Sequence, residues 1–391
     1  MGVLCIMGRP HDASAQAPAT QEPAAPQTVS AEQLKAAIDK LGDFDYAVRS
    51  GAARTVRRTV ATQAVPALLQ AVADHTDGYV RYRALVLLTG FNDPRTKDAM
   101  RESLSSPNDR LRAVAYSFFE HNPEPEMIPA FLTALDKEQG EFVRPELVRA
   151  LAAQGADPRV RQALLREVGR GEDFFRSAVI EAFGDHKAAY AYDQLASITR
   201  LDGPLQDDAA IALGKIGDKR ALEPLAAIQR TAPKTTQPSI AAAICLLGTN
   251  CPSHQGYLSD LLKFANENAG FQEMLRGAAA GLGVLAVAGH AEAAASLAAA
   301  GTGSANDATR APVALAFATV ALRNTPLTMD LLEKHEDQAG AIALLAEGFD
   351  MLEEDLDKER FFAFARRTYW GSPESSPRRA LMQSLIGKLD F

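Results

Sequence analysis

Residues 208–225 read DAAIALGKIGDKRALEPL, and this stretch decides the fold. The apolar residues around its start fall four, four and three positions apart, as on one face of an α-helix: Leu205, Ala209, Leu213 and Ile216. A second set with helical spacing follows a short polar turn: Ala221, Leu225 and Ile228. The pattern therefore predicts two amphipathic helices joined by a turn, without the alternation that indicates a β-strand.

The same unit recurs along the chain. Four segments place an acidic or amide residue before an arginine and an apolar run, and the arginines lie 31, 32 and 32 residues apart: Arg81, Arg112, Arg144 and Arg176. Prolines are expected in the first turn of the second helix of some units: Pro66, Pro129 and Pro224. One helix pair cannot bury its apolar face alone, so the units must stack. The sequence predicts an all-α solenoid shaped as a curved rod with a polar cap at each end.

Residues 208–225 resemble HEAT repeats, in particular the short HEAT-like repeats also found in phycobilin lyases. The start of the family pattern is intact only at Asp77–Arg81, and Gln206 stands where an arginine is usual. The resemblance covers residues 43–330 and, more loosely, the remainder. It implies an α-solenoid, a right-handed superhelix of about ten to eleven stacked helix pairs, with a concave surface for partners. It says little about function, because this fold hosts many unrelated roles.

The chain divides into three parts. Residues 1–30 are expected to be a disordered, Ala/Pro/Gln-rich N-terminus, residues 31–340 the HEAT-like solenoid, and residues 341–391 a divergent repeat with capping helices. Ala13-Ser14-Ala15 resembles a signal peptidase site, but the apolar run before it is short. Two interpretations stay open: the remnant of an export signal, which would place a bacterial protein in the periplasm or outside the cell, or the ordinary N-terminus of a cytoplasmic protein.

Cysteine usage bears on the same question. Cys245 and Cys251 lie six residues apart, one near a predicted helix end and the other in the turn that follows. A disulfide between them would suit an oxidising compartment. The alternative is two free thiols, with Cys245 acting as a small core residue.

The regularly spaced arginines, called here the arginine ladder, admit two interpretations. Arg81, Arg112, Arg144 and Arg176 could grip an acidic ligand along one edge. A structural role is favoured, because acidic residues nearby suit helix N-termini and can pair with the arginines of a neighbouring unit.

Two further groups are expected to be solvated rather than functional. Four histidines fall at turns between helices, without the spacing of a zinc site: His121, His186, His254 and His290. Residues 350–359 form an acidic run that could attract a cation or a basic partner, although Lys358 and Arg360 relieve the repulsion. The sequence predicts no metal site and no cofactor.

The C-terminal segment mixes aromatic residues with arginines, as binding hot spots do. The candidate partner-binding residues are Arg366, Arg367, Tyr369 and Trp370. The same composition suits a capping unit that closes the core, and this interpretation is favoured for most of the segment. Trp370 precedes a turn and is expected to be the most exposed of the four.

Composition narrows the function classes. The chain has 391 residues and a net charge of −8, which argues against a nucleic-acid binder, and no apolar run is long enough to span a membrane. No familiar catalytic motif occurs. The expected function is a non-catalytic scaffold that presents its concave surface to a protein or peptide. The alternatives are an enzyme, either a tetrapyrrole lyase or a HEAT-like DNA glycosylase, and a purely structural spacer.

Overall fold

The computed structural model describes residues 25–268, 270–304 and 307–391. Within these ranges the chain forms twenty-two α-helices and no β-strand, which confirms the predicted all-α solenoid. The signal-like Ala13-Ser14-Ala15 lies outside the described residues, as does most of the predicted N-terminal tether. No helix in the described ranges is long and apolar enough to cross a membrane.

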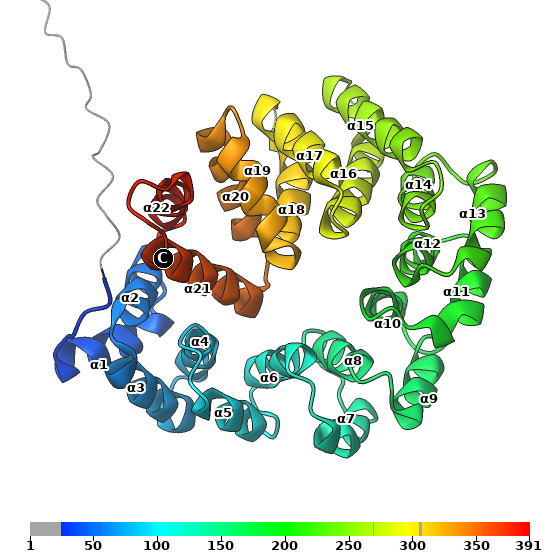
Figure 1. The fold of residues 1–391 in the computed structure, drawn as a ribbon. Coiled ribbons are helices and arrows are strands. Elements are labelled where there is room, and N and C mark those ends of the chain that lie inside the picture. Colours follow the sequence, from blue (N-terminus) through cyan, green and yellow to red (C-terminus); the bar gives the residue numbers. More distant parts are fainter. Residues whose placement is uncertain (1–24, 269, 305–306) are drawn as a thin grey trace, which may run out of the picture.

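The helices form an inner and an outer layer, and both layers run around a ring (Figure 1). The inner layer consists of α4 (Gly78–Thr89), α6 (Asp109–His121), α8 (Arg144–Ala152), α10 (Asp173–Asp185), α12 (Leu205–Ile216), α14 (Gln237–Leu246), α16 (Gln272–Val287), α18 (Asp307–Arg323) and α20 (Gln338–Met351). The outer layer consists of α3 (Ala61–Asp74), α5 (Arg95–Ser103), α7 (Ile128–Leu135), α9 (Pro158–Glu167), α11 (Tyr192–Ile198), α13 (Leu222–Gln229), α15 (Cys251–Glu267), α17 (Ala291–Gly303) and α19 (Thr325–Lys334).

Four more helices lie at the two ends of the chain: α1 (Ala31–Asp39), α2 (Tyr46–Arg58), α21 (Asp355–Gly371) and α22 (Pro377–Leu389). Short 3₁₀ turns precede some of the helices: η1 (Lys40–Gly42), η2 (Pro125–Met127), η3 (Ala189–Ala191) and η4 (Lys219–Ala221). Each repeat thus contributes one inner and one outer helix, and the apolar residues between the layers form the core.

Small residues let the inner helices approach each other closely. A Cβ at Gly184 would lie 2.9 Å from the Cα of Ala212, and one at Gly214 would lie 2.7 Å from the Cα of Ala243. Both glycines occupy the eighth position after the residue that starts the repeat register, Arg176 or Gln206. Glycine at this position therefore permits the close approach of α10 to α12 and of α12 to α14.

The ring is closed, which differs from the predicted rod with two separate caps. Helix α21 leaves the stacking order and packs against α4 and α6, so the C-terminal end lies beside the N-terminal helices (Figure 1). Its Leu356 belongs to the core of the first half of the chain, whereas Phe361 and Tyr369 belong to the core of the second half. The rotation added by each repeat brings the ends together, and each end covers the other.

One predicted helix start was wrong. Pro66 lies inside α3, one turn later than expected, because α3 already begins at Ala61. Backbone pairing of Gln27 with Thr59 and Val60 stabilises the segment just before this helix. Pro129 and Pro224 do lie in the first turns of α7 and α13.

Candidate functional site

The seam that closes the ring is built on a buried ion pair. Arg57 of α2 contacts Glu359 of α21 through two donors, Nε at 2.8 Å and Nη2 at 2.7 Å from Oε2. The two side chains are 6% and 1% exposed. Arg57 also lies over the ring of Phe362, 5.1 Å from its centroid. Because 302 residues separate the partners, this pair holds the two ends of the solenoid together.

A second contact joins α21 to α4. Arg83 Nη1 donates to Asp355 Oδ2 at 2.8 Å, and the Tyr82 hydroxyl donates to the same carboxylate. Burial works against ionisation of Asp355, but the charges of Arg83 and Lys358 outweigh it and lower the pKa of the carboxyl to about 2. Asp355 is therefore ionised and paired in the closed ring.

The last residues of the chain complete the seam. Arg58 Nη2 donates to the carbonyl oxygen of Phe391 at 3.3 Å, and Arg54 pairs with Asp390. Phe391 in turn stacks on Phe362 with ring centroids 4.2 Å apart. Arginines of α2 thus contact carboxylate, carbonyl and aromatic groups of the C-terminal end.

Acid is expected to loosen this seam. The pKa of Asp355 is lower in the closed ring than the ordinary 3.8, so the unfolded state binds more protons and the free energy of unfolding rises with pH. The contribution, about 2 kcal/mol, is present above about pH 4 and is lost as the pH falls towards 2. Urea unfolding of the wild type and of Asp355→Asn at pH 5, 4, 3 and 2 should show a difference that shrinks with acid. A difference that stays constant would contradict this role of Asp355.

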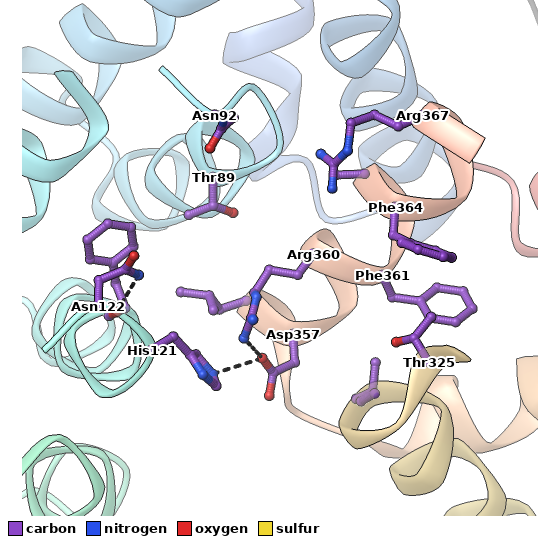
Figure 2. Close-up of a pocket in the computed structure, with 14 residues that line it drawn as sticks. Thr89, Asn92, His121, Asn122, Thr325, Asp357, Arg360, Phe361, Phe364 and Arg367 are labelled. Atoms are coloured by element: carbon purple, nitrogen blue, oxygen red, sulfur yellow. Dashed lines mark hydrogen bonds and ion pairs between the residues drawn. The ribbon is translucent and has the colours of Figure 1, made fainter. Parts of the chain in front are cut away.

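A pocket of about 390 Å³ lies beside the seam, between the ends of α4 and α6 and one face of α21 (Figure 2). His121 at the end of α6 contacts Asp357 of α21, with Nε2 and Oδ1 3.2 Å apart, and Arg360 contacts the same carboxylate at 3.1 Å. Further polar groups in its lining are Thr89, Asn92, Asn122 and Thr325. An imidazole held by a carboxylate can move a proton, but here the pair also joins the two ends of the ring.

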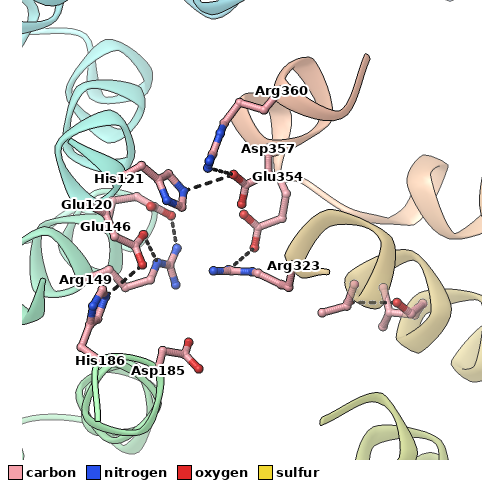
Figure 3. Close-up of polar contacts among 12 residues, drawn as sticks. Glu120, His121, Glu146, Arg149, Asp185, His186, Arg323, Glu354, Asp357 and Arg360 are labelled. Atoms are coloured by element: carbon pink, nitrogen blue, oxygen red, sulfur yellow. Dashed lines mark hydrogen bonds and ion pairs between the residues drawn. The ribbon is translucent and has the colours of Figure 1, made fainter. Parts of the chain in front are cut away.

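Charged side chains gather on the inner face next to this pocket (Figure 3). The inner-face cluster comprises Glu120, His121, Glu146, Arg149, Asp185, His186, Arg323, Glu354, Asp357 and Arg360. His186 Nε2 lies 3.1 Å from Glu120 Oε1, Arg149 bonds Glu146, and Arg323 lies 3.7 Å from Glu354. The cluster therefore links α6, α8 and α10 on one side with α18 and α21 on the other.

The ionisation of the cluster follows from its surroundings. Burial opposes the charge of Asp357, but His121, Arg323 and Arg360 outweigh it and lower the pKa of this carboxyl to about 2. Burial, together with the carboxylates of Glu354 and Glu120, raises the pKa of Glu146 to about 7 in spite of Arg149 beside it. Two carboxyl groups with opposite pKa shifts thus occupy one cluster.

Acidic groups exceed basic ones as the inner face continues over α10 and α12. Desolvation and the neighbouring carboxylate of Asp208 raise the pKa of Glu181 on α10. Desolvation also raises the pKa of Asp208, which accepts a hydrogen bond from Ser177 Oγ at 2.5 Å. Lys215 pairs with Asp185 at 2.6 Å. In the described part of the chain, no cation forms an ion pair with Glu181.

The four C-terminal candidates take different positions. Tyr369 is fully buried, and Arg366 donates to the backbone oxygen of Arg57 as part of the seam. Arg367 is exposed and Trp370 is 41% exposed, and both line a second pocket with Phe91 and Pro26. Of the four, Arg367 and Trp370 are thus the exposed side chains in the closed ring, and the half-buried Arg366 lines the same pocket.

The arginine ladder contacts the backbone of the preceding segments. Arg81 Nε donates to Val72 O, Arg112 Nη1 to Ser106 O, Arg144 Nη1 to Leu135 O and Arg176 Nε to Val168 O, at 2.8 to 3.0 Å. Arg112 and Arg144 also pair with Glu138 and Glu167. These bonds satisfy carbonyl groups near the ends of outer helices, where helical partners are missing.

Two expectations from the sequence were wrong. His121 and His186 are not simply solvated turn residues, since each contacts a buried carboxylate, Asp357 or Glu120. The acidic run is not simply solvated either, since Asp355 and Glu359 each pair with an arginine. Residues 352–354 are non-helical, and Asp355 and Glu359 then turn towards arginines of α4 and α2.

Cys245 and Cys251 are joined as a disulfide, with their Cα atoms 4.1 Å apart. The bond connects the end of α14 with the first residue of α15. The helices that it joins, α14 and α15, lie across the ring from α2 and α21 (Figure 1).

Known structures share the helical solenoid. The CpcE–CpcF complex of phycocyanin lyase from Nostoc sp. PCC7120 is 19% identical, with a TM-score of 0.40, over 67% of this chain and 97% of that chain. Importin beta is 16% identical, with a TM-score of 0.41, over 91% of this chain and 55% of its own length. No curated protein matches the sequence. Residues 34–118, from α1 to near the end of α6, match the family model for HEAT repeats.

Proposed function

We propose that the protein is a non-catalytic scaffold whose inner face holds a basic segment of a protein or peptide partner. The observation that carries the proposal is the excess of carboxyl groups on this face. Seven of them, Glu120, Glu146, Glu181, Asp185, Asp208, Glu354 and Asp357, stand against four cations, Arg149, Lys215, Arg323 and Arg360.

The raised pKa values on α8, α10 and α12 support a basic ligand. Desolvation opposes the ionisation of Glu146, Glu181 and Asp208, and neighbouring carboxylates also oppose that of Glu146 and of the exposed Glu181. A lysine or arginine side chain from a partner would relieve that repulsion and favour the ionised forms. The closed ring supports the proposal as well, because the inner helices and their side chains are held in place before a partner arrives.

Fewer observations support the two alternative functions, an enzyme and a structural spacer. An enzyme of the tetrapyrrole-lyase type would use the pocket with His121 and Asp357, but both residues also belong to the seam. A structural spacer would not require the accumulation of carboxyl groups on one face. The exposed Arg367 and Trp370 offer a second, smaller partner surface next to the seam.

A charge reversal on the inner face tests the proposal. A fluorescent arginine-rich peptide is expected to bind the wild type, and Glu181→Lys is expected to weaken this binding by roughly tenfold or more, since it replaces an attraction by a repulsion. The measurement is fluorescence anisotropy at two salt concentrations, with a glutamate-rich peptide as the reference ligand.

The matched control is Glu223→Lys, the same change at an exposed position of the outer helix α13. It should leave the affinity nearly unchanged, because it alters the net charge equally but not the inner face. Equal weakening by both variants, or equal binding of the acidic peptide, would refute an inner-face site.

We also propose that the protein works in the periplasm or is secreted. The bond between Cys245 and Cys251 supports an oxidising compartment. Maleimide labelling of protein taken from cells under acid quenching should leave both cysteines unmodified until a reductant is added. Free labelling of both would favour the cytoplasm.

A further inference from the structure

Three side chains with metal-binding chemistry meet at the edge of the solenoid between α14, α15 and α17. Cys245 comes from the end of α14, Cys251 is the first residue of α15, and His290 is the N-cap of α17. Their ligand atoms all lie within 4.8 Å of one another. Repeat stacking brings His290 to this place, since 39 residues separate it from Cys251.

We propose that the reduced chain binds one thiophilic divalent ion, of which Zn²⁺ is the biological example, through these three side chains. Two thiolates and one imidazole are a donor set that zinc prefers, and a water molecule would take the fourth position. The site is separate from the inner face, and the proposal does not depend on the function proposed for that face.

The observed spacing suits such an ion. Zinc lies about 2.3 Å from sulfur and about 2.0 Å from nitrogen, so a tetrahedral angle places the two ligand atoms roughly 3.5 Å apart. Cys251 Sγ and His290 Nδ1 are 3.7 Å apart. Because the Cα atoms of the two cysteines are only 4.1 Å apart, side-chain rotation alone can separate the two sulfurs to the spacing of neighbouring ligands.

The surroundings allow an ion to enter the site. Cys251 is the first residue of α15, so its side chain lies at the end of a helix. Cys245 is buried at 2% exposure, whereas Cys251 and His290 are half-buried. The ion would thus reach the site from the side of Cys251 and His290.

The disulfide and the ion exclude each other. A thiol or phosphine reductant supplies two electrons, the S–S bond breaks, and two protons from solvent complete the thiols. The ion then displaces these two protons, so its affinity falls as the pH falls. Conversely, a disulfide oxidant removes two electrons from the thiolates, re-forms the S–S bond and releases the ion.

The test uses the full chain with Cys5→Ser, so that the third cysteine cannot contribute. The protein is reduced with a phosphine, freed of reductant under argon and titrated with Co²⁺, then with Zn²⁺ against a chromophoric chelator. One ion per chain and a thiolate-to-cobalt absorption band are expected. Cys251→Ser and His290→Ala should each weaken zinc binding by roughly tenfold or more, because each removes a ligand.

His254→Ala is the matched control, since His254 lies one turn further along α15 and is not one of the three ligands. It should bind zinc like the parent chain, and circular dichroism should show that all variants are folded. The proposal is overturned if the reduced chain gives no thiolate-to-cobalt band. It is also overturned if zinc binding survives Cys251→Ser, or if His254→Ala weakens it as much as His290→Ala.

Discussion

A Glu359→Ala substitution is expected to lower the free energy of unfolding by about 3–5 kcal/mol, because it leaves Arg57 buried without its carboxylate. Other cations close to Arg57 add to the expected loss of stability. Burial and the charges of Arg57, Arg58 and Arg367 lower the pKa of Arg366 to about 10, and Glu359 is the charge that acts against this. Urea unfolding at pH 7, followed by circular dichroism, measures the effect.

A double replacement separates the ion pair from the packing around it. In Arg57→Met, Glu359→Leu no buried charge of the pair remains, and the variant is expected to be considerably more stable than Glu359→Ala. An unfolding midpoint of Glu359→Ala close to that of the wild type would contradict the seam. A double variant whose loss of unfolding free energy equals the sum of the losses of the two single variants would contradict it as well.

A Gly348→Ala substitution is expected to destabilise the protein by about 3 kcal/mol, at the upper end of typical overpacking costs. Gly348 of α20 faces α18, and an added methyl group would overlap the carbonyl oxygen of Ala314 and the Cβ of Ala318. Neither atom belongs to a flexible side-chain end, so the two helices would have to move apart. The urea midpoint and the thermal midpoint measure the effect.

Gly387→Ala on α22 is the matched control, since nothing lies within 4 Å of a Cβ at that position. There the better helix propensity of alanine should leave the stability unchanged or raise it by up to about 1 kcal/mol. Similar losses at both positions would show that close contact between inner helices does not set the ring's stability.

The repeat could be predicted because its signal is local. The helical spacing of Leu205, Ala209 and Leu213 shows within one helix which residues face the core, and the ladder of arginines shows the period. The helix that carries these residues reaches its inner position when successive repeats stack on one another. The glycines at the eighth register position were also readable from the sequence, because Gly184 and Gly214 recur in step with the period.

The closure of the ring could not be predicted in the same way. It depends on a small rotation added by every repeat and on contacts such as Arg57 with Glu359, which 302 residues separate. One signal pointed towards it. The acidic residues Asp355 and Glu359 match arginines near the other end, Arg83 on α4 and Arg57 on α2, yet neither end shows by itself that the other is its partner.

The inner-face cluster was missed for the same reason. His121 and Asp357 lie on α6 and α21, and only the closed ring brings them to 3.2 Å. As isolated residues they are unremarkable histidine and aspartate positions near helix ends. Their interaction exists only after the fold is complete, so no spacing rule could identify it.

Closure of the ring is tested most directly by pulsed electron–electron double resonance between spin labels on its two ends. The labels occupy the exposed positions of Gln70 on α3 and Lys388 on α22, in the Cys5→Ser chain with Cys245 and Cys251 left oxidised. A closed ring predicts one narrow distribution of short distances, which Glu359→Ala broadens. A broad distribution of long distances in the parent chain would show an open solenoid and would contradict the account.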